Sequence, residues 1–169
     1  IYDCSNFGYA ALKSDGSVVT WGNSKLDNTG INFGSGGAVK KIVNNSGAFA
    51  ALKTNGSVIT WGRYIYGGDH TRSDNYGIST GSVTSGVKDI FASPLGFVAL
   101  KDDGSVVRWG GASGYGTWFS SATLYPSGSN ITSGVKQVYT QDWEYTGLSN
   151  TGGGLIVTCL KDDGSIVGW

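Results

Sequence analysis

Catalysis by side chains needs several reactive groups close together, and this sequence has few of them. Its one histidine, His70, lies in a short polar stretch with Asp69 and Asp74. Triad chemistry needs a base, an orienting acid and a nucleophile, and one loop histidine supplies too little. The three side chains could touch a metal ion, but their spacing fits no metal motif. We therefore expect a solvated loop, no catalytic residue, no metal, no cofactor and no enzymatic activity.

Two Asp-Asp-Gly triplets, at 102–104 and 162–164, look superficially like pieces of calcium loops. An EF-hand also needs ligands at alternating positions and a closing Glu, and neither segment has them. Glycine doublets such as 36–37 and 67–68 follow no phosphate-binding pattern, since no Lys stands at the required spacing. We interpret the Asp-Asp-Gly triplets as turns.

Aromatic side chains in the variable stretches are the best candidates for binding. Tyr and Trp anchor protein interfaces, and their rings are also the surfaces on which sugars stack. Alternatively, these rings pack their own loops onto neighbouring strands. The candidates are Tyr64, Tyr66, Tyr115, Trp118, Phe119, Trp143 and Tyr145.

Charge and composition exclude several classes of protein. Twelve basic and twelve acidic residues give a net charge of zero, and no basic cluster is present, so a nucleic-acid partner is not expected. No apolar run approaches the roughly 20 residues that span a bilayer.

The composition is unusual for a globular protein. Charged residues are only 14%, while 29 of 169 residues are Gly and 12% are aromatic. This profile indicates an all-β protein with many tight turns. Because the chain begins with Ile and contains no Met, we expect a processed product or a fragment.

The elements that position these residues come from an internal repeat. Four closely similar segments occupy 11–22, 51–62, 99–110 and 159–169. Each runs Leu-Lys, two variable positions, Gly-Ser and then a Val- or Ile-rich stretch that ends in Trp. Self-similarity at this spacing is typical of propellers and solenoids. We expect one domain, 1–169, with repeats at approximately 1–34, 35–83, 84–131 and 132–169, the first and last incomplete.

Each repeat predicts three short strands. The first is the Val-Lys-x-Ile segment, the second ends in Leu-Lys, and the third is Ser-Val-x-x-Trp. An Asx-Gly pair between the last two indicates a hairpin whose two turn residues both have positive φ. The position before the repeat Trp varies and is expected to face outward. We expect the Trp side chains to pack between repeats: Trp21, Trp61, Trp109 and Trp169.

Two cysteines, Cys4 and Cys159, lie near opposite ends of the chain. In an oxidising compartment they could form a disulfide, worth about 3–5 kcal/mol in the loop-entropy model. The alternative is two buried thiols, since Cys159 stands where the other repeats have Ala. Three N-x-S/T triplets permit glycosylation of a secreted chain, at Asn44, Asn55 and Asn130.

The amino-acid pattern of the repeat points to a particular type of propeller. Ser-Gly-Val-Lys-x-Ile, followed by Phe-x-Ala-Leu-Lys-x-Asp-Gly-Ser-Val-x-x-Trp-Gly, resembles the RCC1 repeat and, still more, the repeat of the β-lactamase-inhibitor (BLIP-II-like) propellers. The resemblance covers nearly the whole chain except two inserts. It implies an all-β, seven-bladed propeller with short three- to four-stranded antiparallel blades.

The sequence departs from that pattern in number and in detail. It has about three and a half repeats instead of seven, and the Gly-x-x-His and Gly-Gln-Leu-Gly elements of RCC1 are missing. An insert at roughly 140–154 lengthens the last repeat. Three arrangements are then possible. The chain is a partial ring that forms half of a longer chain, it is one of two chains that together complete a ring, or its repeats form an open stack.

The function expected from these features is that of a module without catalytic activity. We expect a non-enzymatic protein-binding or structural module of a secreted or surface-displayed protein, with a protein partner or self-assembly within a larger assembly. The alternative is a carbohydrate-binding, lectin-like propeller, although loops of such different length argue against identical sugar sites. Nucleotide exchange or β-lactamase inhibition would rest on fold analogy alone.

Overall fold

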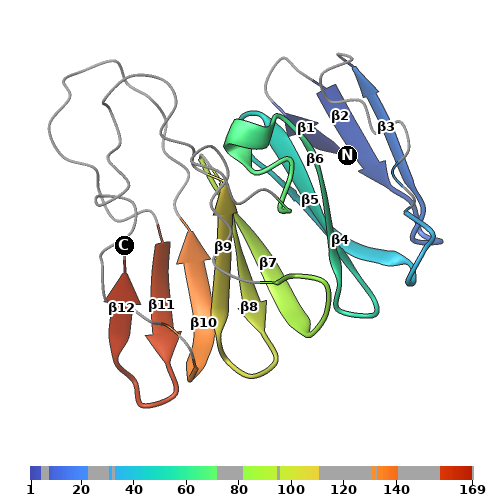
Figure 1. Cartoon of the computed structure of the whole chain (residues 1–169). Helices are drawn as coiled ribbons and strands as arrows, with labels where there is room; N and C mark the ends of the chain where they lie inside the picture. The colour runs from blue at the N-terminus through green and yellow to red at the C-terminus, as the bar shows by residue number, and fades with distance from the viewer. Residues whose placement is uncertain are drawn as a thin grey trace, which may run out of the picture.

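The chain forms short strands joined by tight turns in a computed structural model (Figure 1). The structure describes residues 1–4, 8–22, 31, 33–71, 82–94, 96–110, 131, 133–140 and 157–168. In this part of the chain the first sheet holds β1 (Tyr2–Cys4), β2 (Gly8–Leu12) and β3 (Val18–Gly22), and the second holds β4 (Val39–Asn44), β5 (Ala48–Lys53) and β6 (Val58–Gly62). The third sheet holds β7 (Val87–Ser93), β8 (Gly96–Lys101) and β9 (Val106–Gly110), and the fourth holds β10 (Val135–Thr140), β11 (Val157–Lys161) and β12 (Ile166–Gly168). Among the described residues a short 3₁₀ helix, η2 (Tyr64–Tyr66), follows β6.

The four sheets are antiparallel and three-stranded, with the strands of each in chain order. The first strands of consecutive sheets lie next to one another: β1 beside β4, β4 beside β7, and β7 beside β10. From these inner strands the sheets fan out in sequence, blue to red in Figure 1. This radial arrangement of short sheets is that of propeller blades. The prediction of an all-β, propeller-like fold with three-stranded antiparallel blades is confirmed.

The hairpin turns differ from the expected two-residue type. In the second sheet, Gly56 N donates to Lys53 O, and Lys53 N donates to Ser57 O. The loop therefore holds three residues, and Gly56, with φ +78°, occupies the left-handed position that such loops require. Asn55 has a different role, because its Oδ1 accepts hydrogen bonds from the backbone N and the Oγ of Ser57.

Each sheet has a front face, toward the preceding sheet, and a back face, toward the following one. In the second sheet both faces are covered, so every residue of β5 is buried. The expectation that the position before the repeat Trp faces outward is therefore wrong for Thr60, which is buried on the back face. Period-two alternation separates the two faces of a strand, but in an inner blade a neighbouring sheet covers most of each face.

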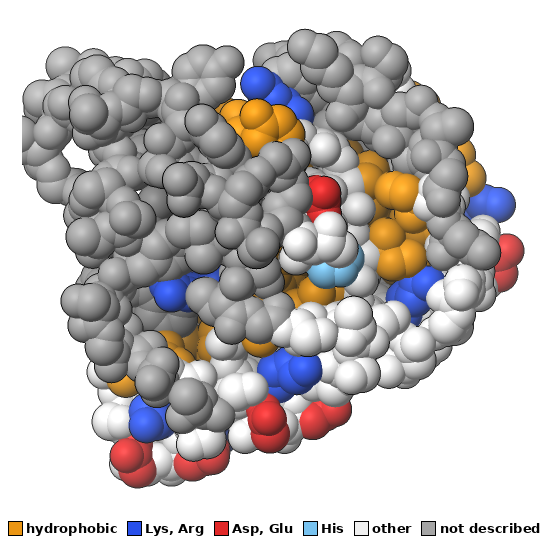
Figure 2. All heavy atoms as spheres, in the orientation of Figure 1, with side chains coloured by type: hydrophobic (Ala, Val, Ile, Leu, Met, Phe, Trp, Pro, Cys, Tyr) orange, Lys and Arg blue, Asp and Glu red, His pale blue; other side chains and the backbone are white. Residues whose placement is uncertain are grey.

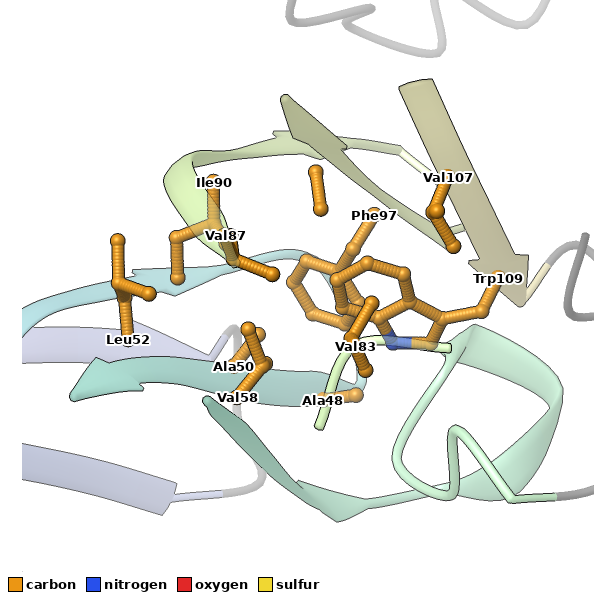
Figure 3. Packing of buried hydrophobic residues seen from close by; sticks show 11 residues of the cluster. Ala48, Ala50, Leu52, Val58, Val83, Val87, Ile90, Phe97, Val107 and Trp109 are labelled. Atoms are coloured by element: carbon orange, nitrogen blue, oxygen red, sulfur yellow. The ribbon is translucent and has the colours of Figure 1, made fainter. Parts of the chain in front are cut away.

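The core consists of clusters between neighbouring sheets. Figure 3 shows the cluster between the second and third sheets, where the rings of Phe97 and Trp109 lie against Ala48, Ala50 and Val58. The small alanines on one sheet make room for the large rings on the next. A similar cluster joins the first and second sheets, and a third joins the third and fourth.

Backbone hydrogen bonds and an ion pair between described residues reinforce the junctions. Val87 N donates to Gly56 O at 2.9 Å, so the hairpin of one sheet holds the first strand of the next. The same bond recurs from Val39 N to Gly16 O and from Val135 N to Gly104 O. Lys41 Nζ also lies 2.7 Å from a carboxylate oxygen of Asp89. Figure 2 shows acidic and basic side chains gathered along the edge where the hairpins lie.

Candidate functional site

The aromatic residues proposed for binding are only partly within the described residues. Tyr64 and Tyr66 belong to η2, whereas Tyr115, Trp118, Phe119, Trp143 and Tyr145 lie outside the described residues. Tyr66 packs against the core cluster between the second and third sheets, and the Arg63 guanidinium lies 5.5 Å from its ring centre. Tyr64 is exposed. The carbohydrate-binding alternative stays a prediction, since it depends mainly on the five residues that are not described.

The histidine is held by a neighbouring strand. His70 Nδ1 lies 2.9 Å from Thr60 Oγ1, and the backbone N of His70 donates to the same oxygen. Burial lowers the pKa of His70, and the nearby charge of Asp69 acts in the opposite direction. Asp69 itself accepts hydrogen bonds from the backbone N and Oγ1 of Thr71. Asp74 lies outside the described residues. In the described ranges no three His, Cys, Asp or Glu side chains form a group that could hold a metal ion.

The Asp residues of the hairpins are occupied as turn acceptors. Asp103 Oδ1 accepts from the backbone N of Ser105 at 2.9 Å and from its Oγ at 2.6 Å. Asp15 and Asp163 make the same pair of contacts in their own turns. Hydrogen bonding to the serine lowers the pKa of all three carboxyl groups. These carboxylates therefore close turns, in agreement with the interpretation from sequence.

The cysteine and asparagine candidates differ in their surroundings. Cys159 is a free, fully buried thiol in the contact between the third and fourth sheets, and burial raises its pKa to about 11. The side chain of Cys4 is outside the described part, so its disulfide with Cys159 stays a prediction. Asn44 Nδ2 donates to the backbone of Asp3 in the first sheet, so a glycan on this nitrogen would displace that bond. Asn55 is exposed, and Asn130 lies outside the described residues.

Lys53 is a buried cation that sequence analysis did not single out. Its Nζ donates to the backbone O of Ser35, and burial lowers its pKa. In the third sheet, Lys101 Nζ donates to Ser85 O at 2.6 Å. The repeat lysine thus ties the turn before a sheet to the sheet's second strand, which is a structural role.

The repeat tryptophans are alike in position and very different in exposure. Trp61 and Trp109 are each 2% exposed. Trp61 stacks on Phe49 with ring centres 5.1 Å apart, and Trp109 packs on Phe97 at 5.5 Å. Trp109 Nε1 also donates to Gly67 O at 3.1 Å. Trp169 lies outside the described residues. Both described inner tryptophans therefore pack between sheets.

Trp21, in the first sheet, makes the same ring contact without a covering sheet. It stacks on Tyr9 at 5.5 Å with the ring planes 17° apart, yet it is 46% exposed. Val19 and Ile1, which occupy the same face, are exposed as well. We call Ile1, Tyr9, Val19 and Trp21 the first end face. This front face is largely apolar, although the exposed Asp3 lies on it opposite Tyr9, and it has no preceding sheet among the described residues.

The back of the fourth sheet is the second largely apolar face at the end of the row, and it also carries the exposed Gln137 opposite Leu160. It carries Ile166, 71% exposed, and Tyr139, 50% exposed. Thr158 and Leu160 lie between them on the same side and are half-buried. We call Tyr139, Thr158, Leu160 and Ile166 the second end face. Sequence reasoning missed both faces, because the repeat pattern does not show which sheet has a neighbour on each side.

The likeness of this chain to proteins of known structure is distant. No model of a known protein family matches the chain, and no curated protein matches it. The solved structure of human WBSCR16, an RCC1-like protein, aligns with a TM-score of 0.41 and 21% identity over 60% of this chain. The aligned region is 31% of the WBSCR16 chain, so the match spans less than a third of that protein. Within the described residues no helix is long and apolar enough to cross a membrane.

Proposed function

We propose that this chain is a non-enzymatic structural module that binds protein through its two end faces. The exposed Tyr9–Trp21 pair carries the proposal. At the equivalent position of the second and third sheets, an aromatic pair is buried by the preceding sheet. The first end face is thus built like a surface that is covered elsewhere in the same molecule.

The energy available from covering these faces is substantial. Full burial of one large apolar side chain stabilises by about 1.5–3 kcal/mol, and aromatic residues are common anchors of protein interfaces. Several such side chains lie on each end face, while association costs at least about 4 kcal/mol in lost freedom. Contiguous apolar patches on a protein surface mark interaction sites. The non-enzymatic part of the proposal rests on the sequence, with its single histidine bound to a threonine.

Sedimentation velocity of the purified chain over a wide concentration range tests the proposal. We expect a mass above 17.6 kDa that rises with concentration, and we expect Trp21→Glu to reduce it. Tyr64→Glu is the matched control, because Tyr64 is 43% exposed but lies in η2, outside both end faces. A wild-type chain that stays at 17.6 kDa at every concentration, and with which no protein co-purifies, would overturn the proposal.

A further inference from the structure

We infer that the two end faces are complementary halves of one contact, and that a second copy of this chain occupies them head to tail. The first end face of one copy lies on the second end face of the other. This inference rests on the proposed function and names the partner for the same surfaces.

The junction between the first and second sheets is the template for this contact. Its two sides belong to one buried cluster, so the structure shows which side chains fit together. The front of the second sheet contributes Ile42, Phe49, Ile59 and Trp61. The back of the first sheet contributes Tyr2, Ala10, Leu12 and Val18.

The first end face repeats the front half of this template. Tyr9 is opposite Trp21 in the β2–β3 ladder, as Phe49 is opposite Trp61 in β5–β6. In the strand registers Ile1, just before β1, corresponds to Ile42 in β4. Val19 takes the position of Ile59. The Tyr9 and Trp21 rings are already stacked without a cover. A rigid, preformed aromatic pair loses little freedom when a partner arrives.

The second end face repeats the back half. Tyr139 and Leu160 match Tyr2 and Leu12 in residue type and in ladder position. Ile166 takes the place of Val18, and Thr158 takes the place of Ala10. Three of the four positions therefore keep a large apolar or aromatic side chain.

The direction of the contact follows from the internal junctions. All three junctions in the described chain place the front of one sheet on the back of the sheet before it. A contact between two front faces would place two aromatic-bearing faces against each other, and no junction within the described chain has that arrangement. A head-to-tail contact is heterologous, so it extends to a ring if the rotation closes and to a filament if it does not.

Complementation between two variants tests the direction. Trp21→Glu places a charge on the first end face and leaves the second unchanged. Ile166→Glu places a charge on the second end face and leaves the first unchanged. We expect each variant alone to self-associate at least about 30-fold more weakly than the wild type, the change expected when an interface anchor is lost. An equimolar mixture should form a one-to-one complex, because each variant supplies the face that the other lacks.

Two results would overturn the inference while leaving the proposed function intact. One is an Ile166→Glu chain that still associates as the wild type does, which would indicate front-to-front pairing. The other is a mixture that stays monomeric although the wild type associates. Circular dichroism melting of both variants checks that each is folded, which their exposed positions favour.

Discussion

The Asx-Gly-Ser triplet shows how one side chain closes a turn. In each described hairpin the Asx Oδ1 accepts hydrogen bonds from both the backbone N and the Oγ of the serine two residues later. Such a turn lets the chain reverse without a positive φ at the Asx, so only the glycine needs the left-handed conformation. Three of the four triplets use an ionised acceptor, and their carboxyl pKa values are lowered.

Ser105→Ala should raise the pKa of Asp103, since the hydrogen bonds of Ser105 are the main cause of its lowering. A lowered pKa in the folded state stabilises above the unfolded pKa, and this stabilisation is lost as the pH falls through the folded value. The variant should therefore be destabilised more at neutral pH than in acid. Carboxyl NMR titration gives the pKa, and urea unfolding at several pH values gives the stability. Ser57→Ala is the matched control, because its acceptor is the uncharged amide of Asn55. The loss of stability that Ser57→Ala causes should therefore not change over the same acidic range.

Cys159 should resist alkylation in the native protein and react after unfolding. It is fully buried, and its pKa of about 11 leaves little thiolate at neutral pH. Mass spectrometry of a Cys4→Ser variant, labelled with iodoacetamide with and without urea, measures this directly. Labelling of the wild type in urea without reductant adds the second test. Failure to label either thiol there would reveal a Cys4–Cys159 disulfide, contrary to the free thiol in the structure.

At the scale of elements, two hairpins of identical sequence have different surroundings. Residues 101–105 and 161–165 are both Lys-Asp-Asp-Gly-Ser. Gly104 and Gly164 both have positive φ, 75° and 83°. A Cβ on Gly104 would lie 2.7 Å from Gly134 N, whereas a Cβ on Gly164 meets nothing within 4 Å. The difference arises because the turn of the third sheet holds the first strand of the fourth.

Gly164→Ala should cost about 1–2 kcal/mol, the strain of an alanine at positive φ. Gly104→Ala should cost clearly more, because its methyl group also pushes against the backbone before β10. Chemical denaturation of both variants at low protein concentration gives the two free energies of unfolding. Equal costs would show that the turn does not hold the neighbouring sheet.

Sequence reasoning predicted the elements better than their surroundings. The repeated Val-Lys, Leu-Lys and Ser-Val segments predicted all three strands of the second, third and fourth sheets, because short-range pattern and turn chemistry determine them. The first sheet has no Val-Lys segment, so the pattern predicted only its second and third strands. The same pattern could not reveal that Thr60 is buried or that Trp21 is exposed, since the difference depends on which sheet has a neighbour. It also suggested a two-residue turn where the Asx–Ser hydrogen bonds support a three-residue one. The long loops with most of the candidate aromatics lie outside the described residues.

At the scale of the whole molecule, each sheet contacts mainly the sheets next to it, so stability is close to a sum of sheets and junctions. A side chain therefore contributes more to the free energy of unfolding at a junction between two sheets than on an end face. Trp61 and Trp21 make a close comparison, because both are stacked on an aromatic partner and only Trp61 is covered by another sheet.

Trp61→Ala should lower the free energy of unfolding by about 3–5 kcal/mol, as expected for a large side chain removed from a core. Trp21→Ala should cost about 1 kcal/mol in dilute solution, where only the stacking on Tyr9 is lost. Because a partner that binds only the folded state stabilises it, the cost of Trp21→Ala should grow with protein concentration. Melting temperatures of both variants and the wild type over a concentration series measure the two effects. A Trp21→Ala cost that is large in dilute solution and independent of concentration would place the end face within the fold of a single chain and not at a contact between chains.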